Sequence, residues 1–540
     1  MVLSAALILW LTRGTSFFSD EFTYFVASRG FDPKALLSPH NGHLIAFIRL
    51  IYATVLALFG PDYLVFRLLE AFGVVLVAGL FFGLAKRRVG APVALAPAIL
   101  LLFFGSAADD TLSPLGITHV YCVAAGLGAL IALERRDLRG DIAGCMLLIL
   151  SVASFSIGLA FLVGGAVAVL LREDRWRRAW VFLVPAGLYL AWALFAPKLT
   201  GPTYNAKTYF RLSNVLLIPN FVANSAAAVA AAIAGLAHDF ANPPAAFGGT
   251  APNLVPEWGY PLALAAAAGL GLRLRRGGVP RSLWVSLALL LAFWAADAMV
   301  YSLNRYPTSE RYAYAGAVAM LLVAADALAG MRIPRRLVPP LLVAVVLALG
   351  ANLYTLRTAS GVIRSYSSTN RAALAAIELA RRQVASDFIP ATRSAAVNLA
   401  YLVEGGAGPV LQAVDRNGSF AFSLAELREQ PEGVREIVDS TLAAALDLSL
   451  EPAASGRALT GCRRLRPSAA IALRPPGVVL RAAATEQVKL GRFADVPTAD
   501  VGSLRPGTAE VLQIPGDHAR EPWHVNLSPG GPVTVCALPR

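Results

Sequence analysis

Residues 63–88 read YLVFRLLEAFGVVLVAGLFFGLAKRR, a mostly apolar stretch that ends in three consecutive basic residues. About 20 consecutive apolar residues cross the hydrocarbon core of a bilayer as an α-helix. Lysines and arginines gather at the cytoplasmic ends of such helices. This stretch therefore predicts a membrane-spanning helix that ends on the cytoplasmic side.

The chain repeats this kind of apolar run on both sides of the stretch. Of its 540 residues, 56% are hydrophobic and 15% are charged, and the mean hydropathy is +0.60. Soluble domains hold roughly 45–50% apolar and about 25% charged residues. The composition excludes ordinary soluble, disordered, collagen-like and disulfide-rich proteins and predicts a multi-pass α-helical membrane protein. The other predicted runs are Val2–Leu11, Ala91–Phe104, Ile117–Leu133, Ile142–Leu171, Ala179–Phe195, Tyr260–Leu272, Ser282–Tyr301, Tyr312–Ala329 and Leu337–Tyr354.

Short loops between these runs carry three or four Lys and Arg each: Lys86–Gly90, Glu134–Asp141, Arg172–Arg178, Arg273–Arg281 and Arg332–Arg336. The positive-inside rule places all of them in the cytoplasm. Ile142–Leu171 has such a loop at each end, so it must turn back, and Ser154–Ser156 is the predicted turn. We therefore expect about eleven spans, with a cytoplasmic N-terminus and an extracytoplasmic C-terminal part, in a bacterial plasma membrane.

The first run, Val2–Leu11, is short and is followed by Arg13. A signal peptide would have a basic start and a small-residue cleavage site, and neither is present. We interpret the run as a first transmembrane helix whose beginning is missing.

The outer segments predicted by this topology are 13–61, 105–116, 196–258 and 303–311. They are long for connections in a compact bundle, and such loops are usually functional. Residues 214–237 are apolar enough for a further span, but that span would turn the next basic loop outward. We therefore interpret them as a membrane-surface or re-entrant helix.

The composition changes after the transmembrane domain, which we assign to residues 1–355. Residues 356–455 have mostly helical patterns, including an amphipathic helix at 371–384. Residues 456–540 contain short alternating runs separated by turn signals, which predicts a small β-sandwich that is a candidate carbohydrate-binding domain. Cys462 and Cys536 bracket this region, and a disulfide between them is permitted outside the cytoplasm, with two free thiols as the alternative.

Paired acids provide the sharpest chemical signals. Asp20 and Glu21 follow the first span, where a carboxylate can act as a general base, ligate a metal or cap the next helix. Asp109 and Asp110 lie in the second outer segment, followed by His119. If the two pairs converge, they form an acidic site for a divalent cation or for sugar hydroxyl groups. We therefore assign Asp20 and Asp109 as candidate metal ligands for Mg²⁺, Mn²⁺ or Ca²⁺.

Histidines and arginines supply the other candidates. His40 and His43 are three residues apart, but the Gly between them and the Pro before them disfavour a helix. Hydrogen bonding to a substrate or to the acids is therefore favoured over zinc, beside the simpler interpretation of interfacial histidines. Arg305 and Arg311 stand among tyrosines, where they could hold a phosphate or belong to an interfacial aromatic belt.

Several of these features together resemble the GT-C glycosyltransferases. They are the acid pair after the first span, a surface helix ending in Leu58-Phe59-Gly60-Pro61-Asp62, a span ending in Lys86-Arg87-Arg88, and the second acidic outer loop. That superfamily includes protein O-mannosyltransferases, aminoarabinose transferases and mycobacterial arabinosyltransferases. The resemblance covers residues 1–354 as architecture, and the chain is closer in style to the many unassigned bacterial members of the superfamily. The β-region is similar in placement to the carbohydrate-binding-like domains of the arabinosyltransferases.

The resemblance implies transfer of a hexose or pentose from a polyprenyl-phosphate donor to an acceptor on the outer face. The acceptor would be a cell-wall polysaccharide, a glycolipid or a protein. Asp20 matches the family's catalytic base, with Glu21 beside it, and Asp109 or Asp110 matches the acid that assists metal or acceptor. Arg305 and Arg311 stand where relatives place a basic residue near the carrier phosphate.

Elementary chemistry agrees with a transferase. The acceptor hydroxyl must lose a proton, whereas the phosphate leaving group needs none, so one carboxylate cluster and one arginine cluster suffice. A glycoside hydrolase would need a second, protonated carboxyl group. The alternatives are a transporter, flippase or polymerase of lipid-linked glycans, and a non-enzymatic envelope scaffold. Transporters place charges at the bilayer midplane, unlike this chain. The basic charge reflects contact with anionic lipid, and we expect no nucleic-acid partner.

Overall fold

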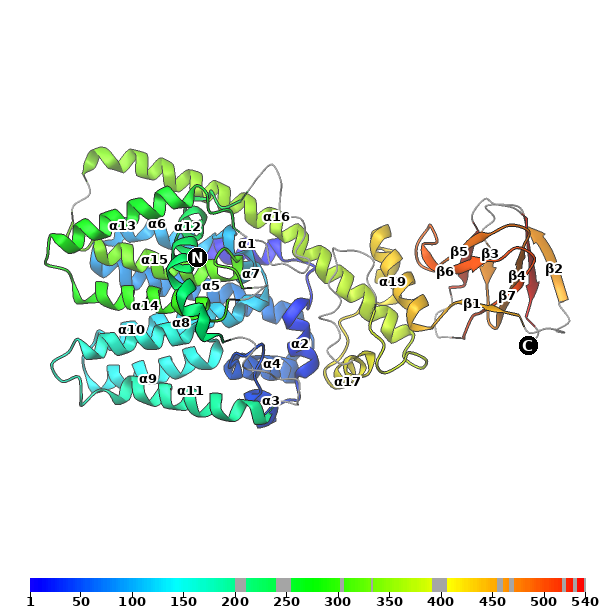
Figure 1. Cartoon of the computed structure of the whole chain (residues 1–540), viewed down its shortest axis with the longest axis horizontal. Coiled ribbons are helices and arrows are strands. Elements are labelled where there is room, and N and C mark those ends of the chain that lie inside the picture. Colours follow the sequence, from blue (N-terminus) through cyan, green and yellow to red (C-terminus); the bar gives the residue numbers. More distant parts are fainter. Residues whose placement is uncertain are drawn as a thin grey trace. The chain divides into compact units, whose positions relative to one another are not determined.

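The computed structural model describes the chain except for residues 200–209, 239–253, 302–304, 332–333, 391–405, 454–459, 466–470, 517–520, 528–531 and 539–540. It forms two compact units (Figure 1). The first unit contains Met1–Gly14 and Ser28–Arg364, and the second contains Thr15–Ala27 and Ser365–Arg540. The division falls inside one continuous helix, α16 (Val338–Leu379).

The first unit is a helical bundle. Its α-helices are α1 (Val2–Leu11), α3 (Pro33–Leu37), α4 (Ala46–Phe59), α5 (Tyr63–Val89), α6 (Ala91–Leu102), α7 (Ala108–Leu112), α8 (Ile117–Leu133), α9 (Leu138–Ser154), α10 (Gly158–Leu170), α11 (Trp180–Leu199), α12 (Ile218–Ala234), α13 (Gly259–Arg275), α14 (Arg281–Met299), α15 (Ala313–Ala327) and the first part of α16. The 3-10 helices η1 (Gly105–Ala107), η2 (Pro114–Gly116), η4 (Leu212–Leu217), η5 (Glu310–Tyr312) and η6 (Arg335–Leu337) join some of them.

Six of the described helical segments are long and apolar enough to cross a membrane, and the bent pair formed by α6 and the 105–112 segment would make seven. Helices α1 and α10 are apolar but shorter than this length, so the eleven spans expected from the sequence are confirmed only in part. The protein is a multi-pass membrane protein. Its long helices expose many apolar side chains. Contact of this surface with water would be unfavourable, whereas contact with lipid is not.

The predicted helical hairpin within residues 142–171 is present. Helix α9 ends at Ser154 and α10 begins at Gly158, so the chain turns where the sequence predicts. The turn is tight because Gly158 has no side chain, and a Cβ atom there would lie 2.5 Å from the backbone carbon of Ser151. Helices α9, α10 and α11 lie side by side (Figure 1).

The membrane-surface or re-entrant helix predicted for residues 214–237 corresponds to η4 and α12 in the structure. Helix α12 packs against α13, α14 and α15, and its alanines at 227, 228, 231 and 232 are almost fully buried. Small side chains allow this close approach: Gly259, the first residue of α13, contacts the backbone of Ala227. Together with η4, α12 is also long and apolar enough to span a membrane.

Ion pairs join several of the basic loops at one end of the bundle. Arg88 Nη1 lies 2.7 Å from Asp326 Oδ2, and Arg87 Nη1 lies 2.6 Å from Glu134 Oε2. In the same end of the unit, the buried carboxylate of Asp141 pairs with two arginines of the 172–178 loop. A buried carboxylate requires such partners, because an unpaired charge in an apolar bundle is costly. The loops that the sequence assigns to one side of the membrane therefore share contacts.

The second unit combines helices with two β-sheets. Its helices are α2 (Ser19–Ala27), the end of α16, α17 (Ala407–Asn417), α18 (Leu424–Arg428) and α19 (Glu432–Ala445). One antiparallel sheet has the order β1-β7-β4-β9-β2, and the other has the order β3-β8-β5-β6. The strands are β1 (Leu450–Pro452), β2 (Thr460–Leu465), β3 (Ile471–Leu473), β4 (Gly477–Ala482), β5 (Glu486–Gly491), β6 (Ala499–Leu504), β7 (Ala509–Gln513), β8 (Trp523–Leu527) and β9 (Val533–Ala537).

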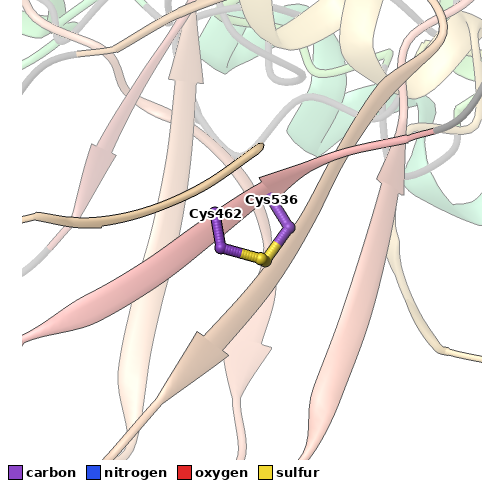
Figure 2. Close-up of a disulfide and its surroundings, with 2 residues drawn as sticks. All are labelled: Cys462 and Cys536. Atoms are coloured by element: carbon purple, nitrogen blue, oxygen red, sulfur yellow. A yellow bond between two sulfur atoms is a disulfide. The ribbon is translucent and has the colours of Figure 1, made fainter. Parts of the chain in front are cut away.

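Alternating strand residues build the core between the sheets. Leu480, Leu512, Val488 and Trp523 are all almost fully buried, and α18 and α19 add their apolar faces to the same core. The predicted β-sandwich is therefore present. Figure 2 shows the disulfide that joins Cys462 on β2 to Cys536 on β9, the first of the two alternatives left open by the sequence.

Candidate functional site

Polar residues of the first unit gather at the end of the bundle that lies opposite the joined basic loops. The N-terminal ends of α8 and α15 meet the C-terminal ends of α9 and α14 there, together with the turn before α4. Together with α7 and the residues between α14 and α15, these segments contain seven of the nine site residues predicted from the sequence. The other two, Asp20 and Glu21, lie in the second unit.

The segment 105–119 folds back on itself and brings an acid to a histidine. Ser113 ends the short helix α7 and caps η2 through a hydrogen bond from Leu115 N–H to its hydroxyl oxygen. Gly116 then packs directly on the backbone of Asp110, where a Cβ atom would lie 2.6 Å from Cα. As a result, Asp110 Oδ1 lies 2.6 Å from His119 Nδ1. Both side chains are buried, and Asp110 Oδ2 bonds to no residue in the part of the chain that the structure describes.

Glu310 was not among the predicted site residues, although it stands next to Arg311. Its side chain is buried, and its Oε1 accepts a hydrogen bond of 2.7 Å from the Ala108 N–H. Burial and the negative charge of Asp109 raise the pKa of Glu310 well above its ordinary value. Glu310 therefore brings a third acid to the segment that carries Asp109 and Asp110.

The two predicted histidines of the first outer segment flank a tight turn rather than a helix. His40 and His43 exchange both backbone hydrogen bonds, with N···O distances of 3.0 and 2.8 Å. Asn41 and Gly42 between them have positive φ angles of 47° and 83°, as a type I′ turn requires. Arg305, which is 8% exposed, donates a hydrogen bond of 3.0 Å to the Asn41 carbonyl. Arg305 thus holds the turn in place.

His43 contacts residues that the sequence did not mark. Its Nδ1 lies 2.7 Å from the hydroxyl of Ser156, which lies 3.3 Å from the hydroxyl of Tyr189. The ring of His43 stacks on Phe155 at 4.1 Å. Burial and the charge of Arg305 hold the pKa of His43 well below its ordinary value, so its imidazole is neutral at neutral pH. Ser156 lay in the predicted turn, but Tyr189 stands within an apolar run that carried no functional signal.

Phe155 connects the two histidine sites. The ring of His119 meets the same phenyl ring edge-on, with centroids 4.5 Å apart. The contacts therefore form a closed circuit through the chain, from the 300s loop to the 40–43 turn, to the α9–α10 turn, to α8, to α7 and back to Glu310. This circuit fixes four of the predicted residues relative to one another: Arg305, His43, His119 and Asp110.

Arg311 is half-buried beside this circuit. Its charge contributes to the lowered pKa of His43. A guanidinium near the neutral imidazole and the buried acids is a candidate ligand for an anionic group of a substrate.

Asp20 and Glu21 form the first turn of α2 in the second unit. Ser19 adopts a positive φ of 52° before them, Glu21 is buried and Asp20 is half-buried. Helix α2 is anchored through aromatic contacts, because Phe22 and Phe25 pack on Phe420 with centroids 5.8 and 5.1 Å apart. The acid pairs thus belong to different units, and their convergence on one site stays a prediction.

Metal binding also stays a prediction. Within the described ranges of the chain, no three His, Cys, Asp or Glu side chains are grouped in a way that could hold a metal ion. Asp109 is half-buried and has contacts of its own, and Asp110 is bonded to His119. The described geometry of the acids thus favours hydrogen bonding over a preformed cation site.

Comparison with known proteins gives two structural matches. No protein-family model and no curated protein sequence matches the chain. Two structures of ArnT from Cupriavidus metallidurans are similar, one in the apo state and one bound to undecaprenyl phosphate. The apo structure has 12% sequence identity and a TM-score of 0.46 over 84% of this chain and 95% of that chain. For the lipid-bound structure the identity is 14% and the TM-score 0.43, over 84% and 96% of the two chains.

Proposed function

We propose that the protein is an integral-membrane glycosyltransferase that moves a hexose or pentose from a polyprenyl-phosphate donor to a cell-envelope acceptor. The reaction takes place at the extracytoplasmic end of the helical bundle, in a bacterial plasma membrane. Asp20 acts as the general base, with Glu21 beside it, and Arg311 binds the carrier phosphate.

The observation that carries this proposal is the closed circuit of buried polar residues at one end of an apolar bundle. It includes a carboxylate oxygen of Asp110 that no described residue satisfies, and an unsatisfied buried polar atom is costly unless a ligand completes it. A sugar offers hydroxyl groups for such an oxygen, and the half-buried Arg311 offers a charge for a phosphate. The lipid-soluble donor would reach this site from the bilayer that surrounds the helices.

The chemistry assigns different tasks to these groups. As the acceptor oxygen attacks the anomeric carbon, its proton passes to the carboxylate of Asp20. The bond from the anomeric carbon to the phosphate oxygen breaks, and its electron pair stays on the polyprenyl phosphate. Arg311 stabilises the resulting negative charge, so no acid is needed on the leaving side.

Replacing the proposed base tests the assignment of Asp20. We expect Asp20→Asn to lower transfer by about 10²–10⁴-fold, because the amide cannot accept the proton. The assay uses purified protein in lipid nanodiscs with polyprenyl-phosphate mannose or arabinose and measures released polyprenyl phosphate. Asp32→Asn is the matched control, since Asp32 caps α3 in the same outer segment and asparagine caps helices equally well. Full activity of Asp20→Asn would refute the role of Asp20 as the base.

The phosphate assignment has its own test. We expect Arg311→Ala to weaken binding of undecaprenyl phosphate by about tenfold or more, because a charge-assisted hydrogen bond contributes roughly 1.5–3 kcal/mol. Binding is measured by the quenching of intrinsic fluorescence in nanodiscs. Arg276→Ala serves as the control, because Arg276 lies in the basic loop that follows the C-terminal end of α13. An unchanged affinity would show that the phosphate binds elsewhere.

A further inference from the structure

The contact between Asp110 and His119 determines which nitrogen of the imidazole carries the proton. Asp110 Oδ1 and His119 Nδ1 are 2.6 Å apart, and the two residues are 2% and 7% exposed. An ionised carboxylate can only accept hydrogen bonds, so Nδ1 of His119 must carry the proton that joins them. In a neutral imidazole, this leaves a lone pair on Nε2.

Nε2 of His119 is available for a ligand. It bonds to no residue among those that the structure describes, and it is not among the buried polar atoms that lack a partner. The edge-on contact with Phe155 and the bond to Asp110 hold the ring from two directions. The imidazole therefore presents a fixed hydrogen-bond acceptor rather than a side chain free to rotate.

We infer that His119 Nε2 accepts a hydrogen bond from a hydroxyl group of the sugar carried by the donor lipid, and that Asp110 is the positioning residue that fixes this tautomer. The inference rests on the proposed function and adds a recognition contact to it. His119 then contributes to recognition of the sugar and not of the phosphate.

The charges around the pair support this division. A lone pair on Nε2 repels phosphate oxygens, which are themselves acceptors, whereas it attracts a hydroxyl hydrogen. Asp110 adds a negative charge on the far side of the ring, which disfavours an anion further. Arg311 offers the phosphate a guanidinium close by. One ligand that contains both groups, a sugar joined to a phosphate, matches both.

Matched lipids separate the two contacts. The affinity of the wild-type protein in nanodiscs is measured for undecaprenyl phosphate and for its mannosyl and arabinosyl derivatives. We expect one sugar-linked lipid to bind about three- to tenfold more tightly than the sugarless lipid, the size of one or two net hydrogen bonds. We expect His119→Phe to remove this preference while leaving the affinity for undecaprenyl phosphate unchanged. Phenylalanine keeps a ring against Phe155 but cannot accept the bond.

Asp110→Asn provides a second variant if His119→Phe does not fold. Its amide group can donate to Nδ1 and so move the proton to Nε2, and we expect the preference for the sugar to fall with the imidazole still present. His524→Phe, on β8 of the second unit, is the control and should keep the full preference. A retained preference in both site variants, or an equal loss of affinity for all three lipids, would overturn the inference.

Nitrogen-15 NMR of histidine-labelled protein provides a readout that does not depend on turnover. We expect wild-type His119 to show a protonated Nδ1 and an unprotonated Nε2, and Asp110→Asn to lose this signature. Protonation of both nitrogens in the wild type would overturn the inference. A wild-type protein that binds all three lipids equally would also overturn it, whereas one that binds none of them would refute the proposed function itself.

Discussion

At the scale of single residues, the candidate site consists largely of polar side chains that are buried from water. His43 and Glu310 both belong to the circuit, and burial shifts their pKa values in opposite directions. Desolvation always favours the neutral form, which is the base for an imidazole and the acid for a carboxyl group. Burial therefore favours the neutral forms of both side chains.

The lowered pKa of His43 predicts how stability depends on pH. The folded state binds a proton at His43 only at lower pH than the unfolded state does, so protonation favours unfolding. This contribution to the free energy of unfolding is complete above pH 6.5 and is lost as the pH falls, by up to about 1.4 kcal/mol per pH unit. We expect His43→Gln, which can still bond to Ser156, to reduce the decline in Tm between pH 7 and pH 5. The same decline in both proteins would contradict the shift.

At the scale of elements, short irregular segments position the chemistry, and long helices hold them. The predicted turn of the 142–171 hairpin is correct, and so is the absence of a helix around His40 and His43. The turn follows from the basic loops at both ends of the apolar run. The absence of a helix follows from the Pro before the histidines and the Gly between them. Ser156 could not be predicted as the partner of His43, nor Tyr189 as the partner of Ser156, because hydrogen bonds between distant residues leave no periodic signal in the sequence. The hydrogen bond from Arg305 to the Asn41 carbonyl could not be predicted either, because the two residues are 264 positions apart in the sequence.

The tight packing of Gly116 on α7 predicts the effect of one methyl group. In Gly116→Ala, the new Cβ would lie 2.6 Å from backbone atoms of Asp110, so the backbone must move. We expect a loss of about 1–3 kcal/mol in stability and a weaker pairing of Asp110 with His119. The measurement is Tm in detergent together with transfer activity. Gly83→Ala in α5 is the control, since nothing lies within 4 Å of the added atom, and it should keep the wild-type activity. Wild-type stability of Gly116→Ala would show that the segment is looser than described.

At the scale of the whole molecule, hydropathy and charge suffice to predict the architecture. They do not suffice to predict which residues belong to which of the two units. The apolar runs, the basic loops and the alternating strands predict a membrane bundle followed by a β-sandwich. They do not predict that residues 15–27 belong with the C-terminal unit, because a few phenylalanines decide it through contacts almost 400 residues away.

The disulfide of the second unit predicts a local change in stability. Cys462 and Cys536 are separated by 74 residues, and opening a loop of this length costs roughly 4–5 kcal/mol in the chain-entropy model. We expect the double variant Cys462→Ser, Cys536→Ser to exchange amide hydrogens faster in β2 and β9, with the helical bundle unchanged. Cys145→Ser, in α9 of the first unit, is the control. Equal protection of both strands in the double variant would show that the disulfide contributes little.

Because residues 15–27 belong to the second unit, the two stretches of this unit must be exchanged together when chimeric proteins are built. The segment that carries Asp20 packs on Phe420, so residues 15–27 and residues 365–540 form one folded unit although more than 300 residues separate them in the sequence. A chimera that takes its C-terminal part from a relative would present foreign side chains to Phe22 and Phe25. Such exchanges should succeed only when both stretches are inherited from the same parent.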